Sequence, residues 1–187
     1  MGIIYCEKDR TFTLQTKNTT YQMQVDRYGF LLHLYYGKKT DGCMDYLLTY
    51  YDRGFSGNPY DAGEDRTYSM DTLPQEYTAY GNGDYRINGL ETEQADGSDT
   101  ANLKYESYKI SKGKYSIKGL PAMFAKEDEA ETLEIVLKDH ASGLRAHLLY
   151  GVFPQLDVIT RAVRLENTGA APVTVKKAMS MEMDYEY

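Results

Sequence analysis

The chain has 187 residues, of which 42% are hydrophobic and 26% charged, so it is long and apolar enough to fold as one large globular domain. Its formal net charge of −7 argues against nucleic acid or an anionic membrane surface as a partner, because both require a basic protein face. No apolar run reaches the length of a membrane-spanning helix.

The cysteines and the first residues indicate the cellular compartment. Cys6 and Cys43 are too few for a disulfide framework and are expected to be free thiols. The sequence starts without a basic segment followed by an apolar one, so no signal peptide is predicted and a cytoplasmic location is expected. Tyrosine is unusually common, with 19 Tyr against 5 Phe and no Trp, and it suits both a sandwich core and a polar surface.

The first third of the chain reads as a run of strands. Residues 11–17 and 20–26 alternate apolar and polar side chains, which is typical of half-buried strands. Residues 30–36 are apolar on both faces and contain His33. Residues 45–51 are apolar enough to form a short strand or a helical turn.

A long irregular segment follows, from Asp52 to Arg86. Its many Gly and Pro residues disfavour both helix and strand, and its tyrosines argue against disorder. Loops of this length are usually functional, and a loop that combines tyrosines with charges of both signs suits a sugar-binding surface. The alternative is a structural plug that closes one end of the fold, with its charges in solvent.

Strands return after this loop. We expect extended structure over 84–91, and a strand over 102–110 with Leu103, Tyr105 and Ser107 on one face. Alternation then predicts strands over 132–138, 144–153 and 158–167. A last strand is predicted over 173–187, with Met179, Met181, Met183 and Tyr185 alternating along it. Strands at this spacing without intervening helices indicate an all-β fold, a large antiparallel β-sandwich.

The predicted last strand runs to the final residue without a turn or polar tail. An unfinished strand edge is a liability in a natural protein. We therefore expect residues 1–187 to be a single sandwich domain that belongs to a longer chain.

Motifs for catalysis and for metal binding are missing from the sequence. His33, His140 and His147 are scattered, so each is expected to be structural or solvated, and neither a metal nor a cofactor is predicted. Acidic residues are plentiful in the long loop, and glycosidases use paired carboxylates. Most of them are better explained as loop-stabilising groups: Asp71 in an Asx turn, and Asp84 paired with Arg86 or Arg66.

The run 69–77 (SMDTLPQEY), followed by 80–86 (YGNGDYR), resembles the amino-terminal domain of bacterial α-galactosidases of glycoside hydrolase family 36. The resemblance continues in 119–122 (GLPA), 129–135 (EAETLEI) and 157–161 (DVITR). It therefore covers nearly the whole chain.

The resemblance implies a supersandwich-like domain that precedes a catalytic (β/α)8 barrel, with a homotetrameric parent enzyme. The nucleophile and the acid/base of the family lie in the barrel, so no catalytic residue is assigned here. The family's loop has two Asp-Arg pairs, matched by Asp52-Arg53 before Phe55-Ser56 and by Asp65-Arg66 before Tyr68. By resemblance, Asp52 and Arg66 are the expected contacts to substrate hydroxyls. The alternative is a salt bridge between them that holds the loop shut.

One departure concerns residues 60–64 (YDAGE), which look longer or differently filled than the family pattern. Four readings of function stay open. The first is a non-catalytic domain of a retaining α-galactosidase acting on melibiose- or raffinose-like sugars. The second is a free-standing carbohydrate-binding module, and the third is a purely structural interaction domain. The fourth is the same domain of an α-N-acetylgalactosaminidase.

Overall fold

The computed structural model describes residues 2–52, 54 and 57–183, and the long strands in it are antiparallel. The first sheet has the order β1-β2-β3-β4, with bounds Ile3–Cys6, Thr11–Gln15, Thr19–Val25 and Leu31–Lys38. The three predicted strands of this region are confirmed within a few residues. Strand β1 was not predicted, because four residues are too short for a visible alternation.

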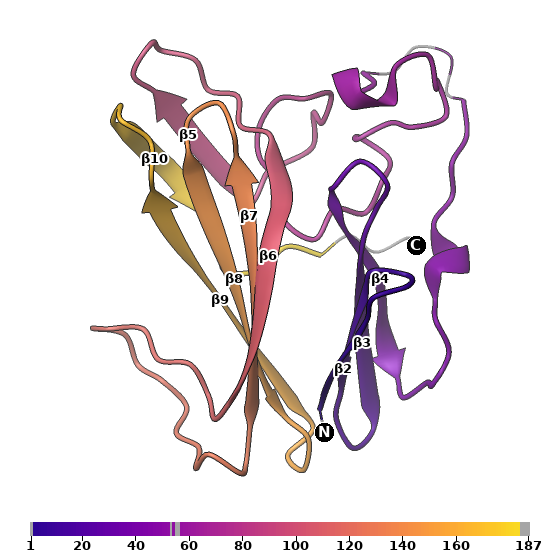
Figure 1. Cartoon of the computed structure of the whole chain (residues 1–187), viewed down its shortest axis with the longest axis vertical. Helices are drawn as coiled ribbons and strands as arrows, with labels where there is room; N and C mark the ends of the chain where they lie inside the picture. The colour runs from indigo at the N-terminus through magenta and orange to yellow at the C-terminus, as the bar shows by residue number, and fades with distance from the viewer. Residues whose placement is uncertain (1, 53, 55–56, 184–187) are drawn as a thin grey trace.

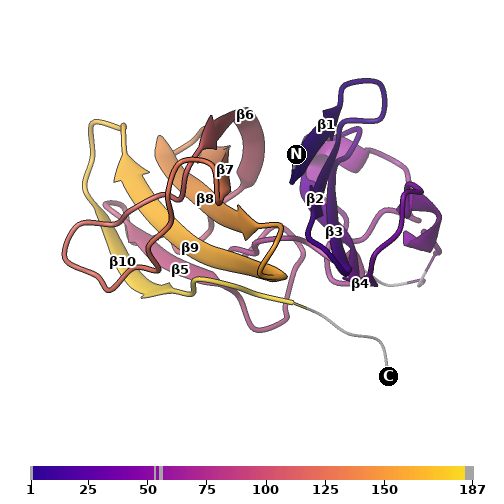
Figure 2. The same cartoon turned by 90° about the horizontal axis from the view of Figure 1, so that it is seen from below.

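The second sheet has the order β6-β7-β8-β9, with bounds Leu103–Lys112, Glu131–Asp139, Leu144–Phe153 and Val158–Asn167. Strands β5 (Leu90–Gln94) and β10 (Val173–Ala178) form a separate antiparallel pair. The pair lies beside β9 in both views of the molecule (Figures 1 and 2). The 3-10 helices η1 (Asp45–Leu47) and η2 (Tyr60–Ala62) lie between β4 and β5, so the helical-turn reading of 45–51 is correct.

The two sheets face each other across one apolar core, which confirms the antiparallel sandwich (Figure 2). Alternate residues of β8 point into this core, as the sequence predicts: Leu144, Ala146, Leu148, Tyr150 and Val152. Phe12, Leu14 and Met23 supply the opposite side and are completely buried. Burial of side chains this large is the main force that holds the layers together.

The predicted last strand over 173–187 is wrong in its length, because β10 ends at Ala178. The Met179 amide donates to the Gly89 carbonyl at 2.8 Å, and the Glu182 carboxylate accepts from the Thr78 amide at 3.1 Å. One backbone bond to Gly89 and a side-chain bond between Glu182 and the loop thus follow β10 in place of a longer strand ladder. Met179 and Met181 are each 49% exposed, and Tyr185 lies outside the described residues. The chain therefore does not remain in a strand as far as it is described.

Two further expectations need correction. Residues 84–89 form only an isolated bridge at Asp84 and bends at Arg86 and Gly89, and the extended strand begins at Leu90. Strand β6 changes register between Tyr105 and Ser107, so Tyr105 pairs with Leu137 on the core face and Ser107 pairs with Val136 on the other. The predicted common face of Leu103, Tyr105 and Ser107 is wrong after Tyr105, because a bulge shifts the alternation by one residue.

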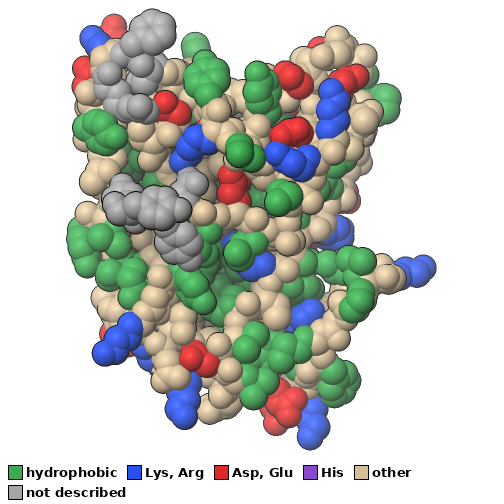
Figure 3. Space-filling model, turned by 180° about the vertical axis from the view of Figure 1, so that it is seen from behind, with side chains coloured by type: hydrophobic (Ala, Val, Ile, Leu, Met, Phe, Trp, Pro, Cys, Tyr) green, Lys and Arg blue, Asp and Glu red, His purple; other side chains and the backbone are tan. Residues whose placement is uncertain are grey.

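The surface carries charges of both signs among apolar side chains, as one broad face shows (Figure 3). The connection between β6 and β7 projects from the sandwich (Figure 1) and exposes Leu120 and Phe124. None of the described helices combines the length and the hydropathy that a membrane crossing requires.

Candidate functional site

The long loop packs against the side of the first sheet that faces away from the sandwich core (Figures 1 and 2). A second apolar cluster lies beneath it, made of Phe30, Leu32, Ala62, Tyr68, Met70 and Leu73. Leu32 comes from β4, and the last four residues come from the loop. The loop is thus ordered by burial of its own apolar residues, as its aromatic content predicts.

Backbone and guanidinium hydrogen bonds fix the second half of the loop. The Glu76 amide donates to the Leu31 carbonyl at 2.9 Å, and the His33 amide donates to the Pro74 carbonyl at 2.7 Å. Arg86 donates to the carbonyls of Met70 and Leu73, both at 2.9 Å, and pairs with Asp84 at 2.9 Å. The Asp84–Arg86 pair was among those expected from the sequence.

The two halves of the loop also touch through glycines. A Cβ added to Gly57 would lie 2.8 Å from the Cα of Gly83, and Gly83 has a φ of +86°. Only glycine combines this close approach with a left-handed backbone. The turn after Tyr80 is therefore a structural contact within the loop.

Asp52 and Arg66, the two predicted substrate contacts, lie together. Arg66 Nε is 3.4 Å from Asp52 Oδ2, and the side chains are 63% and 46% exposed respectively. Arg66 also donates to the Gly54 carbonyl at 2.6 Å, and the Gly54 amide donates to Asp52 at 2.6 Å. The salt-bridge alternative is thus present, but the exposed pair still has hydrogen-bonding capacity toward solvent. The neighbouring motif residues Arg53, Phe55 and Ser56 lie outside the described residues.

The two residues of the second Asp-Arg motif, Asp65 and Arg66, have different roles. Asp65 accepts from the amide of Thr67 at 3.0 Å and from its hydroxyl at 2.6 Å, and it pairs with Arg27 at 2.5 Å. These bonds, led by the one from the Thr67 hydroxyl, lower the pKa of Asp65 below its ordinary value. Asp65 therefore orders the backbone that carries Arg66.

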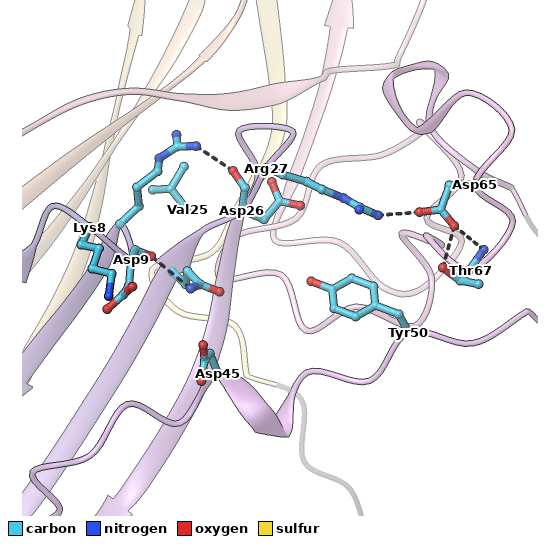
Figure 4. A pocket seen from close by; sticks show the side chains of 11 residues that line it. Lys8, Asp9, Val25, Asp26, Arg27, Asp45, Tyr50, Asp65 and Thr67 are labelled. Carbon is cyan, nitrogen blue, oxygen red and sulfur yellow. Dashed lines mark hydrogen bonds and ion pairs between the residues drawn. The ribbon is translucent and has the colours of Figure 1, made fainter.

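A cavity of about 600 Å³ opens beside this motif, between the turn after β1 and the loop (Figure 4). Lys8, Asp9 and Arg10 line it from that turn, whereas Asp65 and Thr67 line it from the loop and Tyr50 from the segment just before the loop. Its floor includes Asp26, whose carboxylate accepts from the amides of Tyr28 and Phe30 and from the Tyr68 hydroxyl. Sequence reasoning did not predict this cavity, because its two walls are about 40 residues apart in the chain.

Glu76 is completely buried and belongs to the scaffold of the loop. Its carboxylate accepts from the hydroxyls of Tyr21 at 2.8 Å and Tyr150 at 2.7 Å, and it lies 2.6 Å from Arg161. Burial alone would raise the pKa of Glu76, but Arg161 and His33 hold that pKa below its usual range. The sequence carried one signal of this cluster: alternation along β9 put Arg161 on the core face beside Ile159 and Val163.

His33 and His147 lie in structural positions and His140 is exposed, as expected for histidines that are structural or solvated. His33 Nδ1 is 3.3 Å from Glu76, and His147 lies between Glu134 and Glu166 at 2.7 and 3.0 Å. His140 lies in the turn after β7. Within residues 2–52, 54 and 57–183, no group of three or more His, Cys, Asp or Glu could hold a metal ion.

Comparison with known proteins identifies the family. The family model for the glycosyl hydrolase family 36 N-terminal domain matches residues 29–187. The chain belongs to this family. It is 56% identical to the bifunctional alpha-galactosidase/sucrose kinase AgaSK of Mediterraneibacter gnavus over 99% of its length, and 41% identical to alpha-galactosidase AgaA of Geobacillus stearothermophilus over 99%.

Solved structures agree with this family 36 assignment. The galactosidase domain of AgaSK superposes with a TM-score of 0.94 at 57% identity, covering 96% of this chain and 25% of that one. A variant of AgaA in complex with raffinose gives a TM-score of 0.87 at 42% identity, covering 91% and 24%. The family 36 chain described here spans only 20% of AgaSK and 25% of AgaA.

Proposed function

We propose that this chain is the non-catalytic amino-terminal domain of a retaining α-galactosidase that hydrolyses terminal α-galactosides of the melibiose and raffinose type. The observation that carries the proposal is the 56% identity to AgaSK over 99% of the chain. The crystal structure of an AgaA variant with raffinose supports the choice of substrate class. In this proposal the nucleophile and the acid/base carboxylate lie outside residues 1–187.

The loop lends Asp52 and Arg66 to the substrate pocket of the parent enzyme. Their exposure supports this role, because a charged pair in solvent can exchange water for sugar hydroxyls. The domain also supports assembly of the parent into a homo-oligomer, a tetramer, in which the pocket is shared. The free, exposed cysteines Cys6 and Cys43 suit a reducing compartment, and a cytoplasmic location belongs to the same proposal.

Hydrolysis of two aryl glycosides by the full-length parent tests the proposal. We expect turnover of an aryl α-galactoside in the parent and none in the 187-residue chain. Preference for the aryl α-N-acetylgalactosaminide would assign the parent to the alternative specificity. Hydrolysis by the 187-residue chain that is lost with Asp52→Asn would contradict the non-catalytic assignment.

A free-standing carbohydrate-binding module is the second candidate. The ordered loop with its exposed tyrosines favours it, since Tyr60 and Tyr85 are 98% and 77% exposed. It differs from the first proposal in one observable respect: the gene would encode no catalytic barrel downstream of this domain.

A further inference from the structure

We propose that the cavity between the turn after β1 and the long loop is a non-catalytic binding site for a neutral saccharide. The cavity is an open depression of about 600 Å³, a volume in the range of small-molecule sites, and polar and charged side chains form most of its lining. It is separate from the Asp52–Arg66 pair, since neither of these residues lines it. The proposal rests on the proposed function only for its choice of sugar.

The charges around the cavity favour an uncharged ligand. Its lining holds the cations Lys8, Arg10 and Arg27 and the carboxylates Asp9, Asp26, Asp45 and Asp65. Arg27 is already paired with Asp65 at 2.5 Å, and Arg10 donates to the Asp26 carbonyl at 2.8 Å. A strongly charged ligand of either sign would meet like charges here, whereas a polyol can donate to the carboxylates and accept from the cations.

The same carboxylates do not form a cation site. Among the residues that the structure describes, no three acidic or other ligating side chains converge on one point. Both oxygens of Asp26 are occupied by the protein's own donors, the amides of Tyr28 and Phe30 and the Tyr68 hydroxyl.

Tyr50 supplies the apolar surface that a sugar ring needs. Its ring is stacked on Tyr68, with centroids 6.1 Å apart and planes 21° apart, so its orientation is fixed from one side. It is 43% exposed and lines the cavity together with Arg27, whose side chain spans the space between Asp26 and Asp65 in Figure 4. A half-exposed tyrosine that packs on a second ring offers contact area at low entropic cost.

Three polar groups on the cavity wall are available to a ligand. The Lys8 ammonium, the Asp45 carboxylate and the Tyr50 hydroxyl make no side-chain hydrogen bond to any described residue. Lys8 comes from the turn after β1, Asp45 from η1 and Tyr50 from the segment between η1 and the long loop, so a ligand that contacts all three would bridge these segments. The combination of an aromatic ring with donors and acceptors on opposite walls is the chemistry of saccharide recognition.

The test is a titration of the isotopically labelled 187-residue chain with raffinose, followed by amide NMR shifts. We expect saturable shifts at residues 8–10, 25–27 and 65–67. Tyr50→Ala should raise the apparent Kd about tenfold through loss of the ring contact. Tyr50→Phe keeps the ring and should raise the apparent Kd by a smaller factor. Tyr46→Ala is the matched control, since Tyr46 is 69% exposed nearby but does not line the cavity.

If Tyr50→Ala loses the dispersed spectrum of a folded chain, Lys8→Met probes the opposite wall instead and should also weaken binding. Absence of saturable shifts, shifts confined to residues outside the cavity, or wild-type affinity in both variants would overturn the proposal. Failure here leaves the kinetic role of Arg66 untouched. Conversely, an Arg66→Ala parent with wild-type kinetics would leave the cavity site standing and remove only the pocket role proposed for the loop.

Discussion

Arg161 on β9 and Glu76 in the long loop form an ion pair at 2.6 Å, with side chains 6% and 0% exposed. The Arg161 side chain also lies over the Tyr150 ring, 4.6 Å from its centroid. Because Tyr21 from the first sheet donates to the same carboxylate, this pair joins the loop to both layers of the sandwich. The placement of the loop that carries Asp52 and Arg66 therefore depends on a buried charge cluster.

Removal of either charge should destabilise the fold strongly. Glu76→Gln leaves the Arg161 guanidinium buried without a counter-charge, which we expect to lower the free energy of unfolding by about 3–5 kcal/mol. Arg161→Lys keeps the positive charge and should lower the free energy of unfolding less than Arg161→Met does. Urea denaturation measures each change.

Arg164→Met is the control for this cluster, because Arg164 lies on the same strand but its side chain is 51% exposed. Arg164→Met should change the free energy of unfolding by less than about 1 kcal/mol. A Glu76→Gln variant as stable as Arg164→Met would contradict the structural role of the buried pair.

Asp157 makes stability depend on acid pH. It accepts from the hydroxyl of Thr16 and from the side-chain amide of Asn18 at 3.0 Å, and these bonds, that from Thr16 foremost, lower its pKa from 3.8 to about 2. Since the folded-state pKa is depressed, the stabilisation is present above pH 3.8 and is lost as the pH falls through about 2. Asp157→Asn should therefore lower Tm at neutral pH, and the difference from wild type should vanish near pH 2.

The choice of asparagine at position 157 preserves the backbone, whose φ is 59°, because Asn tolerates the left-handed region. Asp128→Asn is a suitable control, since Asp128 is exposed and has no partner in the described part of the chain. A Tm difference for Asp157→Asn that stays constant between pH 7 and pH 2 would exclude the proposed linkage.

Alternation predicted the regular part of the fold because each long strand buries one face. Strands β7, β8 and β9 agree with their predicted spans almost residue for residue. The sequence failed where a side-chain contact replaced the ladder, as at Glu182 after β10, and where a bulge reversed the alternation after Tyr105. Neither a side-chain contact nor a bulge produces a periodic pattern in the sequence.

The candidate site was predicted only in part, for a related reason. The salt-bridge alternative placed Asp52 beside Arg66, and the structure has the two side chains 3.4 Å apart. Their contacts to substrate stay a prediction. The buried roles of Glu76 and Asp26 depend on partners more than 40 residues away, Tyr150 and Tyr68. Such contacts are fixed by the packing of the loop against the sheets, which local sequence does not specify.

Tyr68→Phe should destabilise the attachment of the loop. Tyr68 is fully buried, and its hydroxyl is the donor to Asp26 Oδ2. Loss of that donor leaves a buried carboxylate oxygen unsatisfied, so we expect a loss of about 1–3 kcal/mol in the free energy of unfolding. Tyr60→Phe, at a residue 98% exposed, should be neutral in the same denaturation series. Equal stability of the two variants would mean that solvent or another donor replaces the hydroxyl.

Arg66→Ala should separate binding from stability. The Asp52–Arg66 pair is 3.4 Å long and largely exposed, so its removal should change the free energy of unfolding by less than about 1 kcal/mol. If Arg66 makes a charge-assisted contact to a substrate hydroxyl, kcat/KM of the full-length parent on an aryl α-galactoside should fall by the equivalent of about 1–3 kcal/mol. Arg164→Ala, which removes an exposed arginine from the other sheet, controls for loss of surface charge. Parallel losses of stability and activity would indicate that Arg66 only holds the loop in place. Unchanged kinetics on every α-galactoside would show that Arg66 does not contact the substrate.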